Sequence, residues 1–160
     1  QMLKAGDPNE PATKAERESS VALRSLVSAT VLVAAVFLAW GMVHRARAEH
    51  SLALGLDEER RGGSPRAEQY FRAGLARVPD DGRLHYGLAR SLYAQEQYPA
   101  ALAEALKAER TIADAHLEVL KARLQDQMAY RSPALEAYRH ALRLDPTLKS
   151  VPADIERLTR

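Results

Sequence analysis

The sequence contains no cysteine, and this absence excludes several classes of site. Disulfides, thiolate zinc sites, iron–sulfur clusters and a cysteine nucleophile all require the missing side chain. Phe and Trp are also few, with two Phe and one Trp among 160 residues. The rest of the chain is rich in Ala, Leu, Arg and Glu, which lose little on entering a helix. The composition therefore favours an all-α protein.

Neither sign of charge is in clear excess. The 23 Lys and Arg residues stand against 21 Asp and Glu, and the two signs are interleaved along the chain. A nucleic-acid interface needs a concentrated basic face, so we expect no nucleic-acid partner. The phosphate-binding patterns G-x-G-x-x-G and P-loop and the hydrolase pattern G-x-S-x-G are absent. We therefore expect neither an enzyme nor a small-molecule substrate.

The histidines are not spaced as metal ligands on a helix. None lies three or four residues from another, which is the spacing that places two ligands on one helix face. We expect neither a metal nor a cofactor. The alternative at His44, ligation of a partner's haem or chlorophyll beside a membrane, is less favoured than an interfacial polar role. The five histidines are His44, His50, His85, His116 and His140.

Residues 25–43 form an uncharged, mostly apolar run. As a helix these 19 residues would reach ~28 Å, close to the ~30 Å thickness of the hydrocarbon layer. Arg24 precedes the run, and His44 and Arg45 follow it, as expected of residues at the two interfaces. We predict one transmembrane helix within residues 21–47.

Two alternatives to a transmembrane anchor remain open. A core helix of a soluble protein would have a polar face, whereas this run contains only Ser25, Ser28 and Thr30. A cleavable signal peptide would fit the A-x-A pattern at residues 46–48. The run is longer than the usual apolar core of such a signal, so an uncleaved anchor is favoured.

The segment before the run, residues 1–20, contains Pro8 and Pro11 among mixed charges, and we expect it to be a flexible tail. Within 15 residues of the run, three Lys or Arg lie before it and two after it, a balance that reverses in a window of 20. We favour a cytoplasmic tail and a periplasmic repeat region in a bacterial inner membrane. Ala35 and Ala39, four residues apart, offer a small-residue face for packing within the membrane.

The chain from Ala48 onward repeats itself with a period of 34 residues. A third copy is one residue shorter. The recurring residues are Leu54-Gly55 and Leu88-Ala89; Ala67, Ala101 and Ala134; Phe71 and Tyr138; Gly74, Ala108 and Ala141; and Pro79 and Pro146. Small residues at these places let paired helices approach each other, and each pair buries its apolar face by stacking on the next.

This pattern resembles the tetratricopeptide repeat (TPR), and the segments QEQYPAAL and ALEAYRHALRLDP are similar to its turn and its second helix. The resemblance implies an α-solenoid over residues 48–160, with repeats at about 48–81, 82–114 and 115–147 and a capping helix at 150–160. The sequence departs from the family pattern at Glu58, at His85, where Trp is usual, and at Lys121, where Leu is expected. The first helix of the third copy is therefore expected to be shifted or degenerate.

Helix limits follow from the prolines and glycines between apolar segments. We expect helices at residues 48–60, 65–77, 82–95, 99–113, 115–127, 133–144 and 152–158.

In TPR proteins the first helices of the repeats line a concave groove that binds other proteins. The second, fifth, ninth and twelfth positions are Glu49, Leu52, Leu56 and Glu59 in copy one, and Arg83, Tyr86, Arg90 and Tyr93 in copy two. The Arg and Tyr stripe suits carboxylates and apolar side chains of a partner, and the alternative is an ordinary solvated surface. Leu52 and Leu56 replace the Lys and Asn of the clamp that grips heat-shock chaperone tails. These leucines meet either an apolar partner or the repeat's own neighbours.

We therefore expect a membrane-anchored scaffold or adaptor that acts in the assembly or quality control of a membrane or envelope complex. Its partners would be other proteins and the lipid bilayer. The alternative is a small accessory subunit that packs into a larger membrane complex through Ala35 and Ala39.

Overall fold

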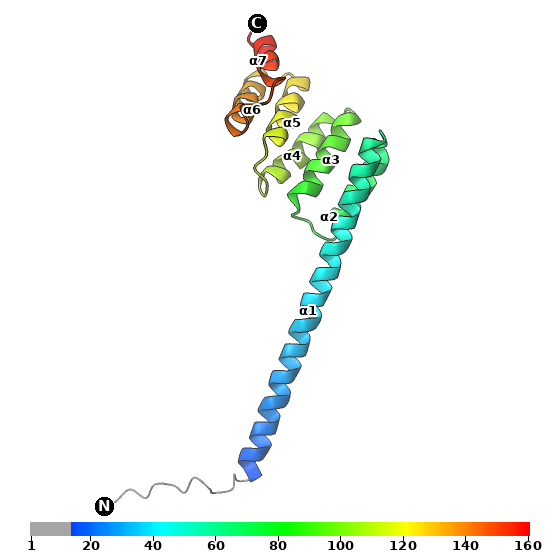
Figure 1. The fold of residues 1–160 in the computed structure, drawn as a ribbon, viewed down its shortest axis with the longest axis vertical. Helices are drawn as coiled ribbons and strands as arrows, with labels where there is room; N and C mark the ends of the chain where they lie inside the picture. Colours follow the sequence, from blue (N-terminus) through cyan, green and yellow to red (C-terminus); the bar gives the residue numbers. More distant parts are fainter. Residues whose placement is uncertain (1–13) are drawn as a thin grey trace, which may run out of the picture. The chain divides into compact units, whose positions relative to one another are not determined.

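The computed structural model describes residues 14–160, without the side chains of residues 14–22 and 25. The described residues form helices and no strand (Figure 1). The helices are α1 (Lys14–Arg60), α2 (Ser64–Leu75), α3 (Gly82–Ala94), α4 (Tyr98–Glu109), α5 (Ala115–Gln127), α6 (Arg131–Leu144) and α7 (Val151–Thr159). The expected all-α class is confirmed. Among the repeat helices, the largest difference from the expected limits lies at the end of α4, which is Glu109 instead of residue 113. The chain turns there, because the backbone N–H groups of Thr111 and Ile112 both donate to the carbonyl oxygen of Ala108.

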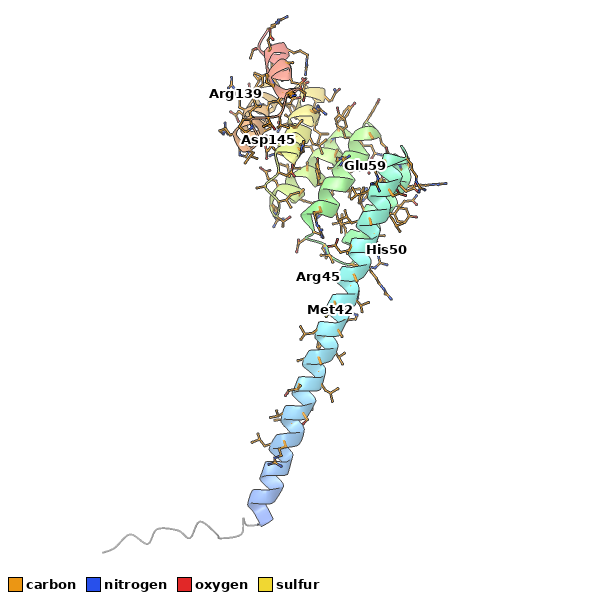
Figure 2. All side chains as sticks on the ribbon, in the orientation of Figure 1. Met42, Arg45, His50, Glu59, Arg139 and Asp145 are labelled. Carbon is orange, nitrogen blue, oxygen red and sulfur yellow. The ribbon has the colours of Figure 1, made fainter. Side chains whose placement is uncertain are left out.

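The chain divides into two units, residues up to Met42 and residues Val43–Arg160. In the first unit, α1 begins at Lys14, earlier than the expected boundary at residue 21, and residues 1–13 of the expected tail lie outside the described residues. The large apolar side chains from Leu26 to Val43 are 46–73 % exposed (Figure 2). Among the described residues, α1 is the one helix long and apolar enough to cross a membrane.

In the second unit, the core is organised around Phe71 of α2. Its side chain is fully buried between two helix backbones at positions that carry no side chain. A Cβ atom added at Gly55 of α1 would lie 2.5 Å from the Phe71 ring, and one added at Gly87 of α3 would lie 2.6 Å from it. Glycine is therefore required at both positions, because the ring occupies the space that any side chain would need.

The same use of small residues recurs in each copy. Ala67, Ala101 and Ala134 occupy equivalent positions in the second helices, and all three are fully buried. Tyr138, at the position of Phe71 in the third copy, is also buried. After the last copy, α7 buries Val151 and Leu158 against α6, as expected of a capping helix.

The expected shift of the first helix in the third copy does not occur. The helix α5 runs from Ala115 to Gln127, the predicted limits, with Lys121 buried inside it. The helix accommodates this charge because Lys121 Nζ lies 2.8 Å from Glu109 of α4 and 3.1 Å from Glu118 of α5. An ion pair therefore replaces the apolar contact that leucine would make.

His85, at the position where the repeat pattern usually has Trp, makes two hydrogen bonds. Its Nδ1 lies 2.6 Å from Glu104 of α4, and its Nε2 lies 2.8 Å from the carbonyl oxygen of Pro79. Burial raises the pKa of Glu104, but hydrogen bonds from Lys107 and His85 outweigh it and hold this pKa below its ordinary value. The histidine thus joins α3 to α4 and to the loop before α3.

Enlarging Gly87 should destabilise the repeat domain. We expect Gly87→Leu to lower the free energy of unfolding by about 2–3 kcal/mol, because the added carbons overlap the Phe71 ring. Chemical unfolding followed by circular dichroism in detergent measures this change. The control is Gly41→Leu, because no atom lies within 4 Å of a Cβ added at Gly41. Equal stability of the two variants would show that the contact of Phe71 with α3 is not required.

Candidate functional site

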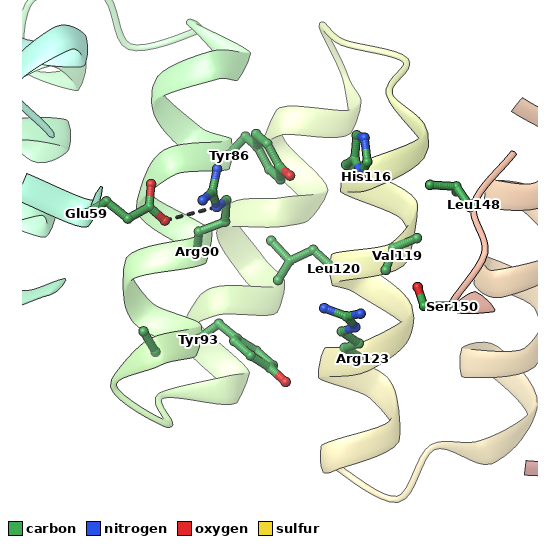
Figure 3. A pocket seen from close by; sticks show the side chains of 11 residues that line it. Glu59, Tyr86, Arg90, Tyr93, His116, Val119, Leu120, Arg123, Leu148 and Ser150 are labelled. Carbon is green, nitrogen blue, oxygen red and sulfur yellow. Dashed lines mark ion pairs between the residues drawn. The ribbon is translucent and has the colours of Figure 1, made fainter. Parts of the chain in front are cut away.

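A pocket of about 390 Å³ lies between α3 and α5 (Figure 3). Residues of α1, α3, α5 and the loop before α7 surround it. They are Glu59, Tyr86, Arg90, Tyr93, Ala94, His116, Val119, Leu120, Arg123, Leu148 and Ser150. The residues from α3 lie three and four positions apart, so they form one face of that helix.

Arg90 is held in place from two sides. Its Nε lies 2.9 Å from Glu59 Oε1 at the end of α1, and its guanidinium carbon lies 5.6 Å from the centre of the Tyr86 ring (Figure 3). Burial raises the pKa of Glu59, and the charge of Arg90 opposes this rise. Burial likewise raises the pKa of Tyr86, so its hydroxyl stays protonated. The charge of Arg90 is therefore balanced within the protein.

Tyr93 extends the aromatic face by one helical turn. Its ring centre lies 5.8 Å from that of Tyr98, with the ring planes inclined by 54°. Such a tilted pair is a favourable arrangement of two aromatic rings, and it restricts the orientation of Tyr93. The α3 side of the pocket thus offers the rings of Tyr86 and Tyr93, one on each side of Arg90, whose charge is balanced by Glu59.

The α5 side combines an apolar floor with an unpaired cation. Val119 and Leu120 are mostly buried, and they lie between His116 and Arg123 in Figure 3. Arg123 is exposed and forms no ion pair with the residues that the structure describes. Its guanidinium keeps all of its donors for a ligand. The pocket can therefore receive an apolar side chain and a carboxylate side by side.

The structure brings together three members of the predicted stripe, Tyr86, Arg90 and Tyr93, with Glu59 from copy one. Arg83 lies in a separate pocket of about 250 Å³, where its guanidinium contacts Glu49 and lies 3.2 Å from Asp81.

The two leucines of copy one lie outside the pocket. Leu52 is buried in the core, so it meets the repeat's own neighbours, which was one of the two alternatives. Leu56 is 38 % exposed and does not line the pocket. On α1, Ala35 and Ala39 are exposed, and no contact in the structure tests their predicted role in membrane packing.

Sequence reasoning missed the contribution of α5, although a signal was present. His116, Val119 and Arg123 lie 33 residues after Arg83, Tyr86 and Arg90, so they occupy the same repeat positions once the missing residue is placed before α5. Leu148 and Ser150 belong to the loop before α7, and nothing in the repeat pattern indicates their place.

No feature of the described residues favours a bound metal. Among residues 14–160 with described side chains, no three His, Asp or Glu residues cluster as ligands. The side chains of the pocket can offer aromatic, apolar and cationic contacts to a ligand.

Comparison with solved structures identifies the fold. The chain is similar to the TPR domain of Arabidopsis OM64, with a TM-score of 0.70 and 15 % identity over 72 % of this chain and 96 % of that one. It is similar to the type III secretion chaperone SycD of Yersinia enterocolitica in complex with a YopD peptide, with a TM-score of 0.63 and 18 % identity over 69 % and 91 % of the chains. The TPR2B domain of yeast Sti1 in its pHsp70 complex has a TM-score of 0.62 and 23 % identity over 71 % and 93 %.

No family model matches the sequence, and no curated protein matches it either. At these identities, the likeness to solved structures establishes the TPR fold and no more. What the pocket binds must be argued from its own residues.

Removing the charge of Arg90 should change the titration of Glu59. We expect Arg90→Met to raise the pKa of Glu59 further, because the burial that raises it would then act without the opposing positive charge. Carboxyl NMR titration of the two proteins measures this pKa. Arg72→Met is the control, because Arg72 pairs with Glu68 at 2.8 Å and not with Glu59. An unchanged pKa would show that the contact with Arg90 is not maintained in solution.

Proposed function

We propose that this chain, which has the fold of TPR domains, is a membrane-anchored scaffold that binds a segment of another protein between α3 and α5. The observation that carries the proposal is the unpaired Arg123 beside an apolar floor and two tyrosines in one pocket. The similar structures support this reading, since that of SycD contains a peptide of YopD and that of Sti1 is a complex with pHsp70.

The pocket indicates the chemistry of the bound segment. Tyrosine and arginine anchors are frequent at the centres of protein interfaces. Val119 and Leu120 offer contact to one apolar side chain, while Arg123 offers two parallel hydrogen bonds to a carboxylate. Because Glu59 already balances the charge of Arg90, a carboxylate of the ligand would gain less binding free energy beside Arg90 than beside Arg123. The expected ligand is a segment with an apolar residue next to an acidic residue.

The exposed apolar side chains of α1 support a membrane anchor. A soluble monomer rarely exposes a contiguous apolar surface larger than a few hundred Å². All described large apolar side chains from Leu26 to Met42 are more than half exposed, and a bilayer would cover them on every side of the helix. We propose a single crossing of a bacterial inner membrane, with the tail in the cytoplasm and the repeats in the periplasm.

The cellular role follows from combining an anchor with a binding pocket. A fixed scaffold raises the local concentration of its partner at the membrane, which suits the assembly or quality control of a membrane or envelope complex. The alternative, an accessory subunit packed through Ala35 and Ala39, predicts a different result on detergent extraction. Recovery of one partner in equal amounts supports the subunit, and recovery of several partners in smaller amounts supports the scaffold.

Reversing the charge of Arg123 should weaken partner binding. We expect Arg123→Glu to reduce the recovery of cross-linked partners from membranes by about tenfold, which corresponds to about 1.4 kcal/mol. Quantitative mass spectrometry after cross-linking measures the recovery.

Two arginines serve as controls for this experiment. Arg139→Glu changes an exposed arginine of α6 outside the pocket, and recovery should be unchanged (Figure 2). Arg83→Glu tests the other end of the predicted stripe, and we expect a smaller loss because Arg83 lies in a different pocket. If Arg123→Glu behaves like Arg139→Glu, the pocket is not the binding site.

An arginine in the middle of the apolar run should prevent insertion. We expect Val33→Arg to be found largely outside the membrane, since a central arginine costs about 2.5–3.5 kcal/mol. In spheroplasts of the wild type, added protease should digest the repeats and spare a tag at residue 1. Leu106→Arg, at an exposed leucine of α4, is the control and should behave as the wild type. Protection of the repeats from protease would show that the orientation is the opposite one, and digestion of both the tag and the repeats would exclude the crossing.

A further inference from the structure

The buried side of α5 differs from that of α3 at two equivalent positions. Leu88 and Leu92 of α3 are 2 % and 1 % exposed and belong to the core. The residues 33 positions later on α5 are Lys121 and Gln125. Two leucines of the second repeat thus correspond to a cation and an amide in the third, so this part of the core is more polar in the third repeat than in the second.

The charge of Lys121 is balanced within the protein. Its ammonium group lies 2.8 Å from Glu109 and 3.1 Å from Glu118. Glu118 is itself buried, and its second oxygen lies 3.2 Å from His140 Nδ1 of α6. These four side chains satisfy one another, so Lys121 has no need of an external ligand.

The side-chain oxygen of Gln125, in contrast, has no hydrogen-bond partner among the described residues. This Oε1 atom is also buried. An unpaired buried acceptor lowers stability, whereas a leucine such as Leu92 at the same position would not. A donor from outside the chain would therefore gain a hydrogen bond at this oxygen.

Gln125 borders a cleft of about 290 Å³ between α5 and α6, which we call the polar cleft. Its residues are Glu118, Lys121, Gln125, Pro133, Glu136, Ala137, His140 and Arg143. Lys121 and Gln125 each lie two residues from Arg123, which is about 200° around a helix with 3.6 residues per turn. The polar cleft therefore opens on the opposite side of α5 from the pocket of the proposed function.

The two ends of the polar cleft differ in charge. The helices α5 and α6 run antiparallel, and the contact between Glu118 and His140 places Gln125 opposite Pro133, near the turn. At this end Glu136 is exposed and forms no ion pair with the described residues. Arg143 lies at the other end, beyond His140. The end near the turn thus has two unpaired acceptors, the exposed carboxylate of Glu136 and the buried amide oxygen of Gln125.

We propose that the polar cleft binds an arginine side chain of a second protein segment, independently of the pocket between α3 and α5. A planar guanidinium can donate to the Glu136 carboxylate and, once the Gln125 side chain turns its oxygen toward the cleft, to that oxygen as well. Its aliphatic stem would lie along Pro133 and Ala137, which are the apolar residues of the cleft. The repeat domain then holds a basic segment on one side of α5 and an acidic segment on the other.

The test uses the full-length chain in detergent micelles and N-acetyl-arginine amide as the probe, followed by NMR. We expect saturable shifts of the Gln125 side-chain amide and of residues along α6. Glu136→Gln changes an exposed residue that does not endanger the fold, and it should reduce the affinity at least fivefold. Gln125→Leu should reduce the affinity to the same extent and raise the midpoint of thermal unfolding by about 3 °C, because it removes the unpaired acceptor. Gln127→Leu, at an exposed glutamine of the same helix, is the control and should leave the affinity unchanged.

Several results would overturn the proposal. They are equal affinity of Glu136→Gln and the wild type, equal affinity for N-acetyl-lysine amide, or a lower unfolding midpoint for Gln125→Leu. Arg123→Glu should leave arginine binding unchanged while it weakens partner recovery. Failure of the polar cleft and failure of the pocket between α3 and α5 are therefore distinguishable.

Discussion

The repeat domain depends on the close approach of helix backbones, and the clearest case is the contact of Phe71 with Gly55 and Gly87. The ring takes the volume that two side chains would otherwise fill, so it fits only where both neighbouring helices lack a Cβ atom. Alanines play the same part in the later copies, where they are fully buried between paired helices. Since these contacts set how α1, α3 and α5 lie beside one another, they also place the faces that form the pocket.

Within this frame, α5 carries two surfaces with opposite preferences. On one side Arg123 is an unpaired cation next to an apolar floor, which suits an acidic ligand. On the other side Gln125 and Glu136 are unpaired acceptors, which suit a basic ligand. Two other charged side chains, Arg90 of α3 and Lys121 of α5, are each balanced by nearby glutamates. In the two proposed sites, charge balance therefore distinguishes the residues expected to bind a ligand from those that stabilise the fold.

The helix α1 joins two different environments in one element. Before Val43 its large apolar side chains are exposed on all sides, whereas after it Ala48 and Leu52 are buried against the repeats. A helix that is apolar all round needs an apolar surrounding, and one with a single buried face needs only a neighbouring helix. This difference is the physical basis for proposing that the part of α1 before Val43 crosses a membrane and that the repeats lie outside the bilayer.

The sequence by itself determined the helical class, the repeat period and nearly all the helix limits, because these follow from local patterns of small and apolar residues. It also indicated Tyr86, Arg90 and Tyr93, which share one face of α3 through their spacing alone. Only the tertiary structure decided that Leu52 belongs to the core, that Arg83 lies in another pocket, and that Lys121 stays inside an undistorted helix. The physical reason is that burial and charge pairing depend on neighbours from other helices, such as Glu59 for Arg90 and Glu109 for Lys121, and no local pattern encodes those distances.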